Sequence, residues 1–132
     1  MEKKKPRILI IEDDEYSREA IEHLLNAKGF ETISAAGGIA GYRAARRRTP
    51  DVIVLDLNLP DVDGQQVLRK FRGNRALGQV PIVVITGYGP DEIPAEVKWG
   101  ADFCITKPAS FDGVIRAIFS LLGGTAASGG EK

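Results

Sequence analysis

The chain has 132 residues, 43% of them hydrophobic and 27% charged, a composition typical of one globular domain whose core needs no disulfide or metal. Its 18 basic and 18 acidic residues cancel, which argues against a protein that binds nucleic acid directly. A single cysteine excludes an internal disulfide, and no apolar run is long enough for a membrane helix or a signal peptide, so we expect a cytoplasmic protein without a membrane partner.

Five short segments are apolar and rich in β-branched residues, and we expect each of them to form a strand. In chain order they are RILII (7–11), ETISA (31–35), DVIVLD (51–56), PIVVIT (81–86) and DFCIT (102–106). Three of these segments are nearly continuous apolar runs. Such runs indicate strands that helices cover on both faces of a parallel sheet.

Helices are expected between these strands and after the last one. The first ends near Gly29, and the second, over 38–48, is rich in Ala and Arg. The fourth, within 90–99, contains Pro94, which a helix tolerates only in its first turn, so we expect this helix to be short or to start late. Ser110 is the expected N-cap of the last helix. The apolar residues that mark the first, third and last helices are Ala20, Ile21, Leu24, Leu25, Val67, Leu68, Phe71, Phe111, Val114, Ile115, Ile118 and Leu122.

A strand followed by a helix, five times over, predicts an α/β fold. Such a chain forms a doubly wound, five-stranded parallel sheet with five helices on its two faces. We expect one domain over residues 1–122, followed by a flexible tail over 123–132, which is rich in Gly, Ser and Ala. No second domain is expected.

Acidic residues follow two of the predicted strands at the edge where such sheets bind ligands, the carboxyl ends of the strands. Glu12 and Asp13 follow the first strand, and Asp56 ends the third. If these strands are neighbours, the three carboxylates converge. Two like charges roughly 4 Å apart repel by about 4 kcal/mol at an effective dielectric constant of 20. We therefore predict a hard cation among them, Mg²⁺ or Mn²⁺.

The fourth and fifth strands end in Thr86 and Lys107. A metal and a lysine around one aspartate indicate phosphoryl chemistry, in which Asp56 is the nucleophile and becomes an aspartyl phosphate. Lys107 would neutralise the oxygens of the transferred group, and Thr86 would donate a hydrogen bond to one of them. As alternatives, Glu12 and Asp13 complement the dipole of the following helix, and Lys107 is an ordinary surface lysine.

The motifs ILIIEDD, PDVIVLDLNLPDVDG, PIVVITGYG and GADFCITKP, in this order and spacing, resemble those of a response-regulator receiver domain over about residues 6–122. The resemblance implies a CheY-like, flavodoxin-like fold with strand order 2-1-3-4-5. It also implies a cis peptide bond between Lys107 and Pro108.

The resemblance further implies that a histidine kinase or a histidine phosphotransfer protein phosphorylates Asp56 in a Mg²⁺-dependent reaction. The implied metal ligands are Asp13, Asp56 and the backbone carbonyl of Asn58, with Glu12 acting through water. Thr86 would be the switch hydroxyl, and Lys107 the ammonium that binds the phosphoryl group.

One position departs from the family pattern. Similar receivers usually carry Tyr or Phe three residues before the lysine, where this chain has Cys104. The aromatic side chain that usually relays the switch to a partner surface is therefore missing there. Tyr88, two residues after Thr86, is a candidate to take over part of this role or to slow hydrolysis of the phosphoryl group. Alternatively, it only covers the rim of the site.

Other features are interpreted without a functional role. The basic run at 3–7 is read as a solvated terminus, and RAARRR (43–48) as charges that complement a helix dipole. His23 lies in mid-helix and is read as a solvated residue. Cys104 is read as a small buried hydrophobe rather than a redox sensor.

These expectations describe a stand-alone phosphoacceptor domain that is not an enzyme. It would signal to an unknown downstream protein through a surface that changes on phosphorylation, as a monomer or a weak phosphorylation-dependent dimer. One alternative is a receiver-like docking module that is never phosphorylated. Another is a phosphatase, which would need a second aspartate as general acid at the position of Asn58.

Overall fold

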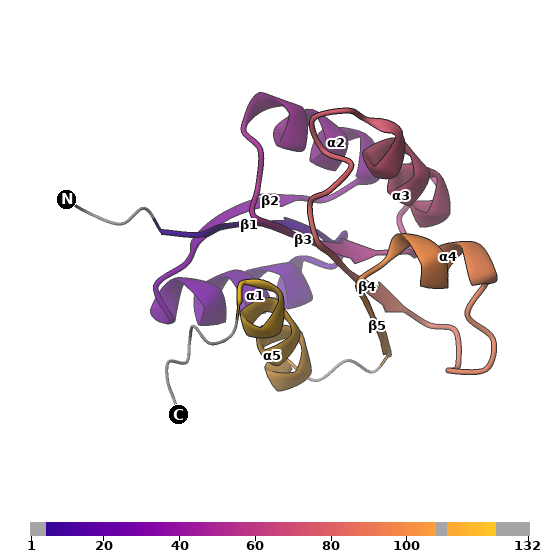
Figure 1. Ribbon diagram of the computed structural model, residues 1–132. Helices are drawn as coiled ribbons and strands as arrows, with labels where there is room; N and C mark the ends of the chain where they lie inside the picture. Colours follow the sequence, from indigo (N-terminus) through magenta and orange to yellow (C-terminus); the bar gives the residue numbers. More distant parts are fainter. Residues whose placement is uncertain (1–4, 108–110, 124–132) are drawn as a thin grey trace.

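The protein is described by a computed structural model that covers residues 5–107 and 111–123. Five strands alternate with five helices in these ranges (Figure 1). The elements are β1 (Arg7–Ile11), α1 (Glu15–Ala27), β2 (Glu31–Ala35), α2 (Gly38–Arg47), β3 (Val52–Asp56), α3 (Gly64–Gly73), β4 (Ile82–Thr86), α4 (Ala95–Gly100), β5 (Phe103–Thr106) and α5 (Phe111–Leu121). The Ser110 cap, the Lys107–Pro108 cis peptide bond and the tail from residue 124 onward lie outside the described residues.

The strands form one parallel sheet in the order β2-β1-β3-β4-β5, which confirms the predicted α/β topology. The chain first adds β2 on one side of β1 and then continues with β3 on the other side. Strand order therefore reverses between β1 and β3, where this class of sheet places its ligands. Ile11 is paired with Leu55, so the residues that follow β1 lie level with the end of β3.

Helices cover both faces of the sheet, with α1 and α5 on one face and α2, α3 and α4 on the other (Figure 1). Successive strand residues alternate between the two resulting cores. In β1, Leu9 and Ile11 pack in the core under α2, α3 and α4, while Ile8 and Ile10 pack in the core under α1 and α5. This double burial explains the nearly continuous apolar runs of the central strands.

Local sequence signals account for where individual helices begin and end. Asp14 caps α1, because its carboxylate accepts a hydrogen bond from the Ser17 amide at 2.9 Å. Gly29 follows α1 with a φ of 94°, the left-handed conformation that favours glycine after a helix. The expected late start of the fourth helix is confirmed, because α4 begins directly after Pro94. None of the described helices is long and apolar enough to cross a bilayer.

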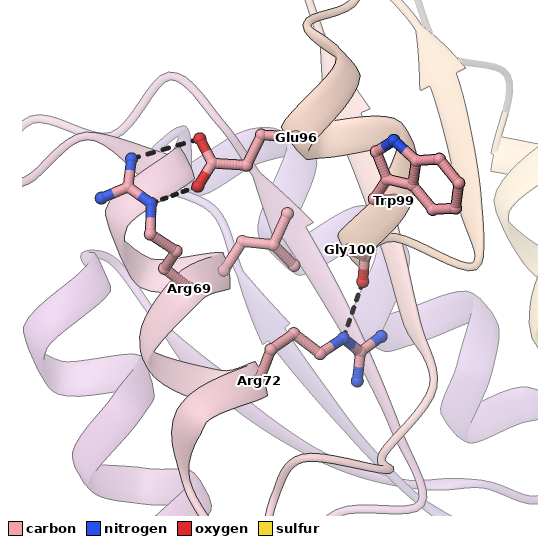
Figure 2. A pocket seen from close by; sticks show the side chains of 6 residues that line it. Arg69, Arg72, Glu96, Trp99 and Gly100 are labelled. Atoms are coloured by element: carbon pink, nitrogen blue, oxygen red, sulfur yellow. Dashed lines mark hydrogen bonds and ion pairs between the residues drawn. The ribbon is translucent and has the colours of Figure 1, made fainter.

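An ion pair between Arg72 of α3 and Asp102 ties together the amino ends of β4 and β5, and we call these two residues the Arg72 clamp. The guanidinium donates to Asp102 Oδ2 at 3.0 Å and to the Val80 carbonyl at 2.6 Å. It also donates to the Gly100 carbonyl at 2.7 Å (Figure 2). Asp102 Oδ2 also accepts from the Ile82 amide at 2.8 Å. The clamp therefore joins α3, α4 and two strands at the edge of the sheet away from the strand carboxyl ends.

Candidate functional site

Three carboxylates meet at the carboxyl ends of β1 and β3. Asp56 is the last residue of β3 and is 1% exposed, and Glu12 follows β1 and is 6% exposed. Asp13 is exposed beside them. One carboxylate oxygen from each residue lies within 4.8 Å of the others. We call Glu12, Asp13 and Asp56 the carboxylate cluster.

Both oxygens of Asp56 have a partner. Oδ2 lies 2.9 Å from Lys107 Nζ, and Oδ1 accepts from the Asn58 amide at 2.8 Å. The backbone of Lys107 is fixed in turn, because its amide donates to the Thr86 carbonyl at 2.7 Å. Asp56 is thus a buried carboxylate held by one ammonium and one backbone N–H.

Thr86 ends β4, one residue beyond the level of Asp56, and is 1% exposed. Its hydroxyl oxygen accepts from the Tyr88 amide at 3.1 Å, so its proton remains available to another acceptor. Within the described residues, no hydrogen bond joins this hydroxyl to Asp56. Thr86 and Asn58 instead line a shared surface hollow of about 360 Å³, with Tyr88 at its side.

Burial and the neighbouring negative charge disfavour the ionised form of one acid in the carboxylate cluster, Glu12. Burial, and after it the negative charge of Asp56, raises the pKa of Glu12 to about 7, although a hydrogen bond from the Asp14 amide opposes the shift. The backbone around the cluster is held by Arg18, which donates to the carbonyls of Glu12 at 2.8 Å and Asp13 at 3.3 Å. These contacts fix the backbone of two of the three acidic residues.

The donor set fits a hard divalent cation. The three carboxylates carry three negative charges when ionised, and the ammonium of Lys107 supplies one positive charge next to them. Carboxylate and carbonyl oxygens are the ligands that Mg²⁺ and Mn²⁺ prefer. The backbone N–H of Asn58 donates to Asp56 Oδ1, so the Asn58 backbone lies beside the carboxylate cluster. A divalent cation would neutralise the excess charge of the cluster.

The structure places the other singled-out residues as follows. Tyr88 is 41% exposed at the hollow beside Thr86. Cys104 is half-buried against the core under α3 and α4, and burial raises the pKa of its thiol, which agrees with its interpretation as a small apolar residue. His23 is exposed on α1, as expected of a solvated residue.

Asp61 has a role that the sequence reasoning missed. Its carboxylate accepts from the backbone amides of Gly38 at 2.9 Å and Ile39 at 3.0 Å. It thus caps α2 from a distant loop, because the N-cap residue Gly37 has no side chain to do so. The missing cap in "AGGIA" was the available signal, although it does not identify the acceptor.

The chain resembles known proteins in both sequence and structure. The family model described as the response regulator receiver domain matches residues 8–119. The transcriptional regulatory protein AfsQ1 of Streptomyces coelicolor is 37% identical over 117 residues, which span 86% of this chain but 51% of AfsQ1, about half its length. The polar-differentiation response regulator DivK of Brucella suis is 30% identical over 117 residues, spanning 88% of this chain and 95% of DivK.

Solved structures give the same result. The receiver domain of the sensor histidine kinase PA1611 from Pseudomonas aeruginosa superposes with a TM-score of 0.80 at 26% identity, covering 91% of this chain and 99% of that one. That structure is described with a magnesium ion coordinated in its active site cleft. The chemotaxis response regulator CheY4 of Vibrio cholerae has a TM-score of 0.83 at 24% identity, covering 89% and 99%. These likenesses confirm the CheY-like fold.

Proposed function

This chain belongs to the response regulator receiver domain family of two-component systems, and on that basis we propose that it is a phosphoacceptor whose acceptor residue is Asp56. The observation that carries this proposal is the setting of the Asp56 carboxylate. It is buried, it contacts Lys107 Nζ at 2.9 Å, and it shares a cluster with Glu12 and Asp13. A carboxylate with this neighbourhood is held in place for attack on a phosphorus atom.

The proposed reaction is a transfer from a phosphohistidine of a histidine kinase or a histidine phosphotransfer protein. An oxygen of Asp56 forms a bond to phosphorus while the phosphorus–nitrogen bond of the donor breaks. The imidazole leaves with the bonding electron pair. The product is an aspartyl phosphate, and the chain itself acts as the acceptor rather than as an enzyme.

The neighbouring side chains stabilise the charge of the transferred group. Lys107 neutralises one phosphoryl oxygen, and Thr86 donates the proton of its hydroxyl to another. Mg²⁺ or Mn²⁺, when bound by Asp13, Asp56 and the Asn58 carbonyl with Glu12 acting through water, supplies positive charge to the phosphoryl oxygens. The magnesium ion in the PA1611 receiver supports this assignment. The change at Thr86 and Lys107 then alters the surface that a downstream protein contacts.

A second candidate function is a receiver-like docking module that is never phosphorylated. Cys104 favours it, because a small half-buried thiol stands where similar receivers have the aromatic residue of the switch. A phosphatase is disfavoured, because the carboxamide of Asn58 is too weakly acidic to protonate a leaving group as an aspartic acid would. Under the leading proposal the protein is cytoplasmic, and it is a monomer or a weak phosphorylation-dependent dimer.

Incubation with Mg²⁺ and acetyl phosphate, followed by mass spectrometry of the intact protein, separates these functions. The proposal expects a mass gain of one phosphoryl group that requires Mg²⁺ and is lost in Asp56→Asn. Asp63→Asn is the matched control, because Asp63 lies in the same loop and its cap on the Gln65 amide can be kept by asparagine. No mass gain would favour the docking module, and continuous release of inorganic phosphate would favour a phosphatase.

A further inference from the structure

A groove of about 440 Å³ separates the outer faces of α2 and α3, and we call it the α2–α3 groove. Its apolar lining includes Ile39, which is 49% exposed, together with Val62 and Val67. The ring of Tyr42 completes this lining. The helices α2 and α3 that border it lie on the opposite face of the sheet from α1 and α5 (Figure 1).

Three cations surround this apolar lining. Arg43, Arg46 and Lys70 line the groove and are exposed. The Arg46 guanidinium lies 5.9 Å, and the Lys70 ammonium 5.1 Å, from the centre of the Tyr42 ring. Within residues 5–107 and 111–123, none of the three cations forms an ion pair, and no acidic residue lines the groove. The groove therefore carries uncompensated positive charge.

The helix dipole does not explain this arrangement. Arg46 and Arg47 both lie in the last turn of α2, where either charge complements the dipole. Arg43 lies outside that turn but also lines the groove. Two arginines of α3 differ in this respect, since Arg69 is paired with Glu96 and Arg72 with Asp102. What the cations of the groove share is an apolar hollow that holds no carboxylate.

We propose that the α2–α3 groove binds an acidic segment of a partner protein in which an aliphatic or aromatic side chain is flanked by carboxylates. The apolar side chain fills the space beside Val62 and Val67, and the carboxylates pair with Arg43, Arg46 and Lys70. Charge complementarity of this kind gives both specificity and attraction. A nucleic acid fits less well, because three cations around an apolar lining on a chain of zero net charge make a poor phosphate track.

The two walls of the groove are joined to each other before any partner arrives. Val62 belongs to the loop that follows β3, and its neighbour Asp61 caps the first turn of α2 through the Gly38 and Ile39 amides. A groove whose walls are already fixed loses less conformational entropy when it binds. The proposal rests on shape and charge alone, so it stands whether or not Asp56 is phosphorylated.

A second hollow lies between α3 and α4, and its charged residues show why we assign a partner to the α2–α3 groove and not to this hollow. It lies beside Trp99, which is 88% exposed (Figure 2). Its arginines are already engaged, because Arg69 pairs with Glu96 and Arg72 donates to the Gly100 carbonyl. Nothing there specifies the chemistry of an occupant.

The test is a titration of the ¹⁵N-labelled protein with a capped synthetic peptide, Glu-Asp-Leu-Glu-Phe-Asp-Glu, followed by NMR. We expect shifts of amides in α2 and α3 and a dissociation constant on the order of 100 μM. Arg46→Glu should weaken binding about tenfold, whereas Arg47→Glu should change it by less than about twofold. Arg47 is the matched control, because it is the adjacent exposed cation in the same helical turn and does not line the groove.

Several results would overturn the proposal. They are an absence of shifts at millimolar peptide, an equal loss of affinity in Arg46→Glu and Arg47→Glu, and equal binding of a peptide with Lys in place of each acid. Tighter binding of a single-stranded oligonucleotide with the same dependence on Arg46 would assign the groove to nucleic acid instead. Phosphorylation by acetyl phosphate, measured on the same variants, separates failure of this proposal from failure of the phosphoacceptor assignment.

Discussion

Two charged groups occupy opposite edges of the sheet, and their charges are arranged in opposite ways. At the amino ends of β4 and β5, the Arg72 clamp brings opposite charges together, and Arg72 and Asp102 also bond to the backbone. At the carboxyl ends of β1 and β3, the carboxylate cluster brings three acids together beside one ammonium. The first arrangement stabilises the fold by itself, whereas the second needs a further positive charge.

The comparison distinguishes charge that serves stability from charge that serves binding. In the clamp, opposite charges pair with each other and with backbone groups, so removing Arg72 leaves several acceptors without a partner that they have in the folded protein. In the cluster, the raised pKa of Glu12, about 7, shows that its ionised form is disfavoured in the folded protein. Sites that bind ligands often keep such unfavourable charge at a cost in stability.

The largest expected effect is a loss of stability in Arg72→Ala. The change removes the Arg72 donor from the Val80 and Gly100 carbonyls, and it leaves the Asp102 carboxylate with the Ile82 amide as its remaining donor. We expect the free energy of unfolding, measured in urea, to fall by about 3 kcal/mol. Arg75→Ala is the control, because Arg75 is exposed and forms no ion pair in the described part of the chain, so its loss should cost less than about 0.5 kcal/mol. Equal losses in the two variants would show that the clamp contributes nothing specific.

Removing a charge from the carboxylate cluster should raise the free energy of unfolding, whereas removing Arg72 lowers it. Glu12→Gln removes one of the crowded charges and keeps an oxygen that can accept from the Asp14 amide. Without divalent cations at pH 8, we expect the free energy of unfolding to rise by about 2 kcal/mol. The same variant should take up phosphate from acetyl phosphate more slowly. A loss of stability in Glu12→Gln would contradict the view that the cluster is destabilising.

The pH dependence of this effect follows from the raised pKa. In the unfolded chain Glu12 titrates near 4.5, and in the folded protein near 7, so the folded state binds more protons between these values. The stability contributed by the protonated form is present below about pH 4.5 and is lost as pH rises through about 7. In EDTA, the gain from Glu12→Gln should therefore shrink as pH is lowered from 8 to 5. A gain independent of pH would point to packing rather than charge.

Whether the sequence predicted the two charged groups, the carboxylate cluster and the Arg72 clamp, depends on the type of contact that each group makes. The carboxylate cluster was predictable, because Glu12, Asp13 and Asp56 stand at strand ends and parallel strands end at one edge. Pro94 likewise predicted the late start of α4. The Arg72 clamp was not predictable, because Arg72 bonds mainly to backbone carbonyls, which leave no residue-type signal. The Asp61 cap was missed because its partners lie 22 and 23 residues away.

Metal binding should offset part of the destabilisation that the carboxylate cluster causes and the Arg72 clamp does not. At a Mg²⁺ concentration ten times the dissociation constant, the free energy of unfolding should rise by about 1.4 kcal/mol, because the ion binds the folded state alone. Thermal unfolding with and without Mg²⁺ measures this gain. Asp13→Asn should reduce it, while Arg75→Ala should leave it unchanged. An equal gain in Asp13→Asn would place the ion elsewhere.

The smallest expected effect tests whether an acid at the carboxyl edge can be structural when its hydrogen bonds are satisfied. The amides of Ile39 and Gly38 lower the pKa of Asp61, so its stabilising contribution is present at neutral pH and is lost in acid. Asp61→Ala should cost about 1 kcal/mol of unfolding free energy and speed hydrogen exchange at the Gly38 and Ile39 amides. Asp63→Ala removes the cap on the Gln65 amide of α3 instead. It should cost a similar amount yet leave exchange at those two amides unchanged. If Asp61→Ala were instead stabilising, as expected for Glu12→Gln, acids at the carboxyl ends of the strands would be unfavourable whatever their hydrogen bonds. The two ends of the sheet would then differ by position, and not by whether the charged groups have hydrogen-bond partners.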